Sequence, residues 1–251
     1  DDPRIEQDLT DIDEVVGDLI DYLENRGVSP ILLSEYGLTP VSRPVHLNRI
    51  FRERGWLEVK DELGREILEL GACKAFAIAD HQIAHVYVQD PSIKNEVASV
   101  LAATEGVEMV LEESALAAHG LNHDRCGDFV AVSDAASWFT YYFWEDDAKA
   151  PDYARTVDIH RKPGYDPVEL FVDPKISLPK LKVAGKLAKK ILGFRMLMDL
   201  IPLDATLVKG SHGRRPDEKA DWPVLVGNLP ETPDEIRPTE VQQALLRACG
   251  A

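Results

Sequence analysis

The sequence has few cysteines, and their positions argue against two kinds of stabilised fold. Cys73, Cys126 and Cys249 are odd in number and share no zinc-type spacing. Neither a disulfide framework nor a zinc ribbon is therefore expected. Three cysteines without a disulfide pattern are typical of proteins in a reducing compartment, and we therefore expect a cytoplasmic protein.

Long hydrophobic runs are also lacking. No apolar stretch approaches the roughly 20 residues that a membrane span needs, and we find no signal peptide. No membrane partner is therefore expected. The chain begins "DDPRIEQD", without methionine and in what resembles a loop that leads into a helix. We expect it to be the downstream part of a longer protein.

Basic residues are scarce relative to acidic ones. The 251 residues include 28 lysines and arginines against 44 acidic residues, which gives a net charge of −16. This charge argues against a nucleic-acid polymer or an anionic membrane as a general partner. An anionic substrate would need a local source of positive charge, which bound metal ions can supply.

Three common site motifs are missing as well. The sequence contains no Gly-x-Ser-x-Gly elbow, no phosphate loop ending in Gly-Lys-Ser/Thr, and no Gly-x-Gly-x-x-Gly after a strand. Serine hydrolases, nucleoside-triphosphate motors and dinucleotide oxidoreductases are accordingly weaker interpretations.

The elements that the sequence does indicate alternate between helix and strand. Apolar residues at helical spacing predict a helix from Ile5 that closes near Gly27, and "VSPILLS" after it is typical of a parallel strand covered on both faces. We interpret these as half of a βαβ unit. Further helices are predicted within residues 46–55, 92–106, 112–120, 186–200 and 239–249. Further strands are predicted within 73–90, where Asp80 to Gln82 form a tight connection, and within 107–112, 127–134, 137–144 and 204–210.

This pattern predicts a single α/β domain over residues 1–251, with a largely parallel central sheet flanked by helices. We find no internal repeat and no low-complexity linker. The basic segment "KLKVAGKLAKK" could lie on a membrane surface. We interpret it instead as a helix whose apolar face packs on the core while its lysines are exposed.

Two predicted strand ends carry side chains suited to chemistry, because ligands of open α/β sheets bind beyond the carboxyl ends of strands. Ser34-Glu35-Tyr36-Gly37 follows one strand, and Gly210-Ser211-His212-Gly213 follows another. A carboxylate and an imidazole on neighbouring loops form part of a zinc or manganese site, although two ligands do not define one.

The ordered set "LLSEYGLTPV", "AFAIADHQIAHVYV", "GDFVAVSDAASWFTYYFW", "TVDIHRKPGYDPVELFVDP" and "PLDATLVKGSHGR" resembles the type I phosphodiesterase and nucleotide pyrophosphatase family of the alkaline phosphatase superfamily. The resemblance runs from about Ile5 to Arg214 and matches the downstream portion of such proteins. It implies an alkaline-phosphatase-like fold, here without its N-terminal part. It also implies hydrolysis of phosphodiester or pyrophosphate bonds in a small phosphate ester, possibly a nucleotide.

The resemblance further implies a two-metal site, usually zinc, and a threonine or serine nucleophile that would lie upstream of this chain. The family's metal-binding Asp-His pair falls on Glu35 and Tyr36, and its Gly-x-His-Gly histidine falls on His212. Glutamate can replace aspartate as an oxygen ligand, whereas tyrosine removes a neutral nitrogen donor. The second metal is therefore in question, and no convincing counterpart of the family's Asp-x-x-x-His pair is present.

Other residues are candidates for substrate contact beside Tyr36. His81 lies at a predicted turn, His160 lies in a loop rich in proline and glycine, and Lys209 and Arg214 flank His212 and could pair with phosphoryl oxygens. Two alternatives stay open. The first is a non-catalytic, degenerate binding protein of the same fold, and the second is a hydrolase of phosphomonoesters or phosphonates. The sequence does not give the oligomeric state.

Overall fold

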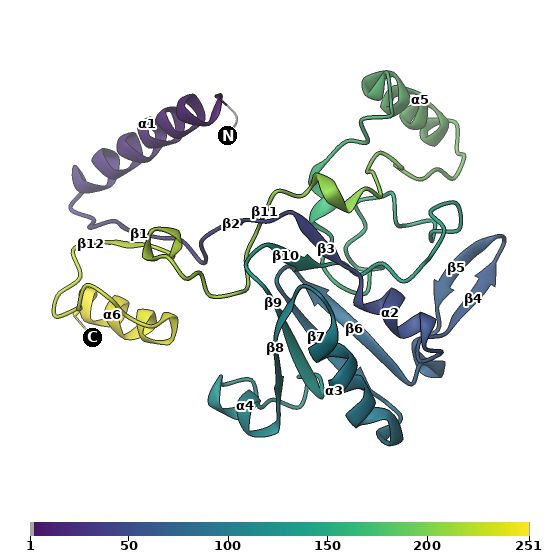
Figure 1. The fold of residues 1–251 in the computed structure, drawn as a ribbon. Coiled ribbons are helices and arrows are strands. Elements are labelled where there is room, and N and C mark those ends of the chain that lie inside the picture. The colour runs from purple at the N-terminus through teal and green to yellow at the C-terminus, as the bar shows by residue number, and fades with distance from the viewer. Residues whose placement is uncertain (1–2, 251) are drawn as a thin grey trace. The chain divides into compact units, whose positions relative to one another are not determined.

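A computed structural model of the protein describes residues 3–250, and the chain divides into two compact units (Figure 1). The terminal unit comprises Asp1–Gly37 and Trp222–Ala251, and the central unit comprises Leu38–Asp221. The predicted single domain over residues 1–251 stays a prediction. Among the described residues, no helix has both the length and the apolar composition needed to cross a membrane.

The largest sheet lies in the central unit and has four strands in the order β6-β7-β9-β8. Its strands are β6 (Ala75–Asp80), β7 (Ile83–Val88), β8 (Val107–Glu112) and β9 (Phe129–Ser133). These strands confirm the predicted ones, but every pairing in this sheet is antiparallel. The expectation of a largely parallel sheet was wrong. A two-residue connection such as His81-Gln82 can only join antiparallel strands, because parallel neighbours need a long crossover.

Two helices cover the face of this sheet that carries small side chains. Ala77 and Ala84 are buried on that face, and the predicted helices α2 (Leu47–Glu53) and α3 (Lys94–Ala103) contribute Phe51 and Leu101 to the same core. Small strand residues allow helices to approach a sheet closely. A smaller cluster forms where the predicted helix α4 (Glu113–Ala118) meets β8 and β9.

Short strands complete the central unit. β3 (Arg43–Val45) pairs in parallel with β10 (Ser137–Phe139), β4 (Val59–Glu62) forms a hairpin with β5 (Arg65–Leu68), and β2 (Thr39–Pro40) pairs with β11 (Gly210–Ser211). The strand predicted over residues 137–144 therefore ends at residue 139. The rest of that segment is buried aromatic chain without strand pairing.

The strand predicted over residues 204–210 is not formed. Residues 205–207 make a 3₁₀ turn instead, because the Asp204 side chain accepts a hydrogen bond from the backbone N–H of Thr206 at 3.0 Å. Such a local hydrogen bond competes with extended backbone. Only the two residues of β11 pair as a strand after this turn.

Helix α5 (Pro179–Ile191) both begins and ends earlier than the helix predicted over residues 186–200, because Gly193, with φ +82°, reverses the chain after it. It buries none of its residues. Leu181 is 66% exposed and Ile191 is 85% exposed, while Lys182 and Lys186 point inward to ion pairs with Asp199. The predicted packing of an apolar face on the core was therefore wrong, whereas Lys180, Lys189 and Lys190 are exposed as predicted.

The terminal unit contains α1 (Ile5–Glu24), β1 (Ile31–Leu33), β12 (Leu225–Gly227) and α6 (Val241–Ala248). Both helices confirm the predicted ones. However, β1 is half-exposed and pairs antiparallel with β12, and α1 buries no residue. The prediction of a parallel strand covered on both faces was wrong, because the apolar run supplies only three paired residues and has a single strand neighbour.

Candidate functional site

Two of the predicted site residues meet in the central unit. The imidazole rings of His81 and His212 lie 3.8 Å apart between centroids, with an interplanar angle of 36°. His81 occupies the β6–β7 turn, where its φ of +56° is in the left-handed region, and His212 directly follows β11. The structure therefore places a hairpin turn and the Gly-x-His-Gly loop against each other.

Backbone contacts hold these two loops together. The N–H of Gln82 donates to the carbonyl oxygen of His212 at 2.9 Å, and the N–H of Phe139 donates to the carbonyl oxygen of His81 at 2.7 Å. Gly213 has φ +112°, and a Cβ there would lie 3.3 Å from the backbone nitrogen of Gln82. The glycine after His212 thus permits both the turn and the close approach.

The sequence reasoning missed two further members of this cluster. Asp80 Oδ1 lies 2.7 Å from His81 Nδ1, and the Tyr165 ring stacks on His81 with centroids 4.4 Å apart. Tyr165 is brought there because its N–H donates to the carbonyl oxygen of Ala79 at 2.8 Å, beside a bridge between Ala79 and Gly164. A signal for Asp80 was available, since an Asp-His dipeptide stood at the predicted turn.

The electrostatics of the cluster favour an ionised Asp80. Its pKa lies below the usual range, chiefly because His81 hydrogen-bonds to it, and the charges of His81, His212 and His85 add to this effect. Desolvation acts in the opposite direction. The arrangement orients the His81 ring through Asp80 and presents imidazole nitrogens from two loops.

The donor side chains of the cluster do not form a complete metal site by themselves. Among the described residues 3–250, no group of three or more histidine, cysteine, aspartate or glutamate side chains could hold a metal ion. Asp80 engages His81 Nδ1, and the two imidazoles overlap as rings. Within the described chain, these donors do not make up the complete metal site that the resemblance implies.

Glu35 and Tyr36 belong to the terminal unit, where they directly follow β1 and Ser34. Ser34 fixes this strand end, because its N–H donates to the carbonyl oxygen of Val224 at 3.0 Å while its hydroxyl accepts from the Val224 N–H at 2.9 Å. Both Glu35 and Tyr36 are exposed. Their predicted roles stay predictions.

The residues that flank His212 differ in what they bind. Arg214 engages both carboxylate oxygens of Glu108, at 2.5 and 3.1 Å, and also contacts Asp217 at 3.1 Å. Its guanidinium is therefore committed to carboxylates, which competes with the predicted contact to a phosphoryl oxygen. Lys209 is exposed, and its carbonyl oxygen accepts from the Val41 N–H at 3.0 Å.

His160 is exposed in the loop before Arg161, which pairs with Asp152 at 2.9 Å. No hydrogen bond or ring contact of His160 occurs within residues 3–250. Its predicted role near the substrate stays a prediction.

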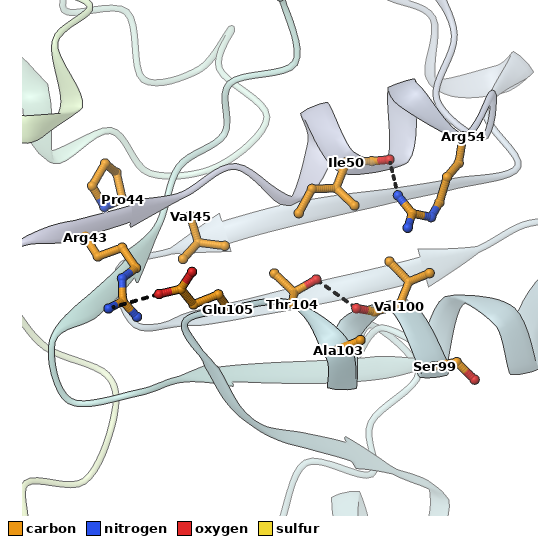
Figure 2. A pocket seen from close by; sticks show the side chains of 10 residues that line it. All are labelled: Arg43, Pro44, Val45, Ile50, Arg54, Ser99, Val100, Ala103, Thr104 and Glu105. Atoms are coloured by element: carbon orange, nitrogen blue, oxygen red, sulfur yellow. Dashed lines mark hydrogen bonds and ion pairs between the residues drawn. The ribbon is translucent and has the colours of Figure 1, made fainter.

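Two cavities of the central unit lie apart from the histidine cluster in the residues that line them. One, of about 550 Å³, lies between α2 and α3 (Figure 2), where Val45, Ile50 and Val100 supply apolar surface and the Arg43 guanidinium pairs with Glu105 at 3.3 Å. A second, of about 490 Å³, is lined by residues of the 150–155 and 186–199 segments and by Arg65. None of the predicted site residues lines either cavity.

Comparison with known proteins gives a family match. Residues 1–166 match the family described as type I phosphodiesterase / nucleotide pyrophosphatase. No curated protein sequence matches.

Solved structures give weaker likenesses. Phosphonoacetate hydrolase from Sinorhizobium meliloti 1021, in complex with phosphonoacetate, is 22% identical with a TM-score of 0.33, over 47% of this chain and 29% of the other. Murine ectonucleotide pyrophosphatase / phosphodiesterase 5 is 21% identical with a TM-score of 0.39, over 55% and 34%. An inactive variant of that murine protein, in complex with AMP, is 20% identical with a TM-score of 0.40, and the match covers 59% of this chain and 36% of the other. The chain thus spans about a third of the length of these proteins.

Proposed function

Because the chain belongs to the type I phosphodiesterase / nucleotide pyrophosphatase family, we propose that it forms part of a phosphoester hydrolase with an alkaline-phosphatase-like α/β fold. The match over residues 1–166 is the observation that carries this proposal. It includes the turn that holds His81, and the contact between His81 and His212 adds a polar cluster at the β6–β7 turn.

The proposed substrate is a small phosphate ester, possibly a nucleotide, cleaved at a phosphodiester or pyrophosphate bond. The family is divalent-metal dependent. We propose zinc, or manganese, with Glu35 and His212 among its ligands, and a threonine or serine nucleophile in sequence that precedes Asp1. A bound divalent cation would polarise a phosphoryl oxygen and supply positive charge at this site in a protein of net charge −16.

This chain's own residues have narrower roles in the proposal. Asp80 fixes the orientation of the His81 ring through their 2.7 Å hydrogen bond, and Tyr165 covers one side of that ring. His212 would then bind a substrate or a metal next to the His81 ring, which Asp80 holds in place. Tyr36, His160, Lys209 and Arg214 remain proposed substrate contacts. A cytoplasmic location remains part of the proposal.

The test uses the protein expressed from the complete reading frame that contains this chain. Metal content is measured by mass spectrometry, and turnover is measured with a chromogenic phosphodiester. His212→Ala should lower both together, with turnover falling by about 100-fold or more because loss of even an outer-shell partner costs 10–100-fold. His119→Ala, which alters an exposed histidine at the end of α4, is the matched control and should change neither. Unchanged metal content and turnover in His212→Ala would refute the assignment.

A non-catalytic binding protein of the same fold is the second candidate. Tyr36 stands where the resemblance implies a metal-binding histidine, and residues 3–250 contain no group of three metal donors. Saturable nucleotide binding without turnover by the complete protein would support this candidate, whereas stoichiometric metal with turnover would exclude it. Phosphomonoester and phosphonate substrates assayed beside the diester would identify the bond that is cleaved.

A further inference from the structure

The cavity of about 490 Å³ in the central unit has an unusual charge for so acidic a protein. Five cationic side chains line it together with only two carboxylates, although acidic residues outnumber basic ones in the chain as a whole. The cations are Arg65, Arg155, Lys186, Lys189 and Arg195, and the carboxylates are Asp152 and Asp199.

Both carboxylates already have cationic partners. Asp199 forms ion pairs with Lys186 and, at 3.4 Å, with Lys182. Asp152 pairs with Arg161 at 2.9 Å, and Arg161 lies outside the cavity lining. Neither carboxylate is therefore available to neutralise the remaining cations.

Three of the cations have no carboxylate partner within residues 3–250. Arg65 donates only to the carbonyl oxygens of Ala148 at 2.9 Å and Ala150 at 3.3 Å, which carry no net charge. Neither Lys189 nor Arg195 makes a side-chain hydrogen bond or ion pair in this part of the chain. Arg155 is partly compensated by Asp173 at 3.6 Å. The cavity therefore keeps an excess of positive charge.

The local fold explains why these groups converge. Lys186 and Lys189 are three residues apart on α5 and so lie on one side of the helix. Gly193, with φ +82°, then reverses the chain, and the N–H of Phe194 donates to the carbonyl oxygen of Lys189 at 3.0 Å. The returning segment brings Arg195 and the apolar Met196 and Leu197 to the same cavity.

We propose that this cavity binds a small molecule through a diphosphate or other polyvalent phosphate group. Two guanidinium groups can each take two phosphate oxygens, and the Lys189 ammonium supplies a third cation. A single carboxylate would engage only part of this set, which favours a multiply charged anion. The volume lies in the range of small-ligand sites, and Met196 with Leu197 offers apolar surface to the organic part of the ligand. This site is separate in its residues from the histidine cluster and needs no metal.

The experiment is a calorimetric titration of the protein expressed from the complete reading frame with inorganic pyrophosphate, in the presence of EDTA to remove divalent cations. The Lys189→Gln/Arg195→Gln variant should bind pyrophosphate about 10-fold or more weakly, because it removes two cations that would form charge-assisted hydrogen bonds to phosphate oxygens. The matched control is Lys180→Gln/Lys190→Gln, which removes the same charge around α5 from residues that do not line the cavity. Circular dichroism verifies that both variants keep their helix content.

Each outcome bears on the proposal. Loss of affinity in the cavity variant with wild-type affinity in the control supports it. Equal weakening in both variants would mean diffuse attraction, and absence of saturable binding at millimolar pyrophosphate would mean no site, so either result overturns it. His212→Ala should leave the affinity unchanged. A loss there would assign the anion to the histidine cluster and overturn this inference while leaving the proposed hydrolase intact.

Discussion

The His81 and His212 rings lie 3.8 Å apart, and the Gln82 N–H joins their two loops by a hydrogen bond to the His212 carbonyl oxygen. Their relationship depends on a turn between β6 and β7 and on the two-residue pairing of β2 with β11. The first prediction therefore concerns the group that fixes the His81 ring.

His81→Ala should raise the pKa of Asp80 toward its ordinary value of 3.8, because the hydrogen bond from His81 is the main cause of its depression. A carboxyl group whose pKa is depressed in the folded state stabilises the fold at pH values above its unfolded pKa, and this stabilisation is lost as the pH falls through the folded pKa. Carbon-13 NMR of the aspartate carboxyl groups between pH 2 and 6 measures the pKa of Asp80 in the wild type and in the variant. Asp90, whose pKa is lowered by Ser92 instead, is the internal control. An unchanged Asp80 titration would contradict this origin of the shift.

The sequence predicted both histidines of the cluster but not their contact. His81 was identified from its position at a tight connection and His212 from the glycines around it. The contact depends on a β2–β11 pairing of only two residues and on the open space that Gly213 leaves beside Gln82. Such short pairings leave no periodic pattern in the sequence. Asp80 was missed because the sequence was searched for metal ligands, whereas this carboxylate orients an imidazole.

For the fold, too, local features could be predicted from the sequence and long-range features could not. Helices such as α1 and α3 were predicted because their apolar spacing is local information. Strand direction was not, because the apolar run around Ile31 is equally compatible with a buried parallel strand and with the half-exposed antiparallel strand that β12 completes. The exposed apolar face of α5 could not be predicted either, since Lys182 and Lys186 pair with Asp199, a residue outside the helix.

The second prediction concerns His46, whose Nδ1 lies 2.7 Å from Thr140 Oγ1 and whose ring stacks on Tyr142. Desolvation, assisted by the charge of Arg49, lowers the pKa of His46 from 6.5 to about 4. As the pH falls, His46 therefore takes up a proton in the unfolded chain before it does so in the folded protein, and the free energy of unfolding should fall by about 3 kcal/mol between pH 6.5 and pH 4. Below the folded pKa, the stabilisation that neutral His46 contributes at higher pH is fully lost.

Urea unfolding at several pH values between 7 and 4 tests this effect. His46→Gln should remove that part of the pH dependence, whatever it does to stability at pH 7, because glutamine does not titrate. His123→Gln, at an exposed loop position, is the control and should keep the wild-type slope. A His46→Gln profile parallel to that of the wild type would show that another group titrates.

The third prediction concerns a buried ion cluster. Lys162 Nζ donates to Asp166 Oδ2 at 2.8 Å and to Glu169 Oε1 at 2.7 Å, and its side chain is fully buried. Lys162→Met should destabilise the protein by about 3–5 kcal/mol, because it leaves buried carboxylates without a cation. Burial raises the pKa of Asp166, so protonation at lower pH should partly restore the variant.

The control for this cluster is a variant that removes all of its charges, Lys162→Met with Asp166→Asn and Glu169→Gln. It should recover most of the lost stability in urea unfolding, since no unpaired charge remains. Lys175→Met, at an exposed lysine, measures the cost of a surface change. If Lys162→Met costs no more than Lys175→Met, the cluster does not have the energetic role assigned to it.

The fourth prediction concerns Gly164, which supports Tyr165 against His81. Its φ is +131°, and a Cβ added there would lie 2.7 Å from the carbonyl oxygen of Ala79 and 3.0 Å from its nitrogen. Gly164→Ala should therefore cost about 1–3 kcal/mol or more in urea unfolding and displace Tyr165, which NMR detects as a changed ring-current shift of His81. Gly185→Ala is the matched control, because that position in α5 has open space and an ordinary φ, and it should stabilise by about 0.5–1 kcal/mol. Equal effects of the two substitutions would mean that the Ala79–Gly164 bridge does not constrain the cluster.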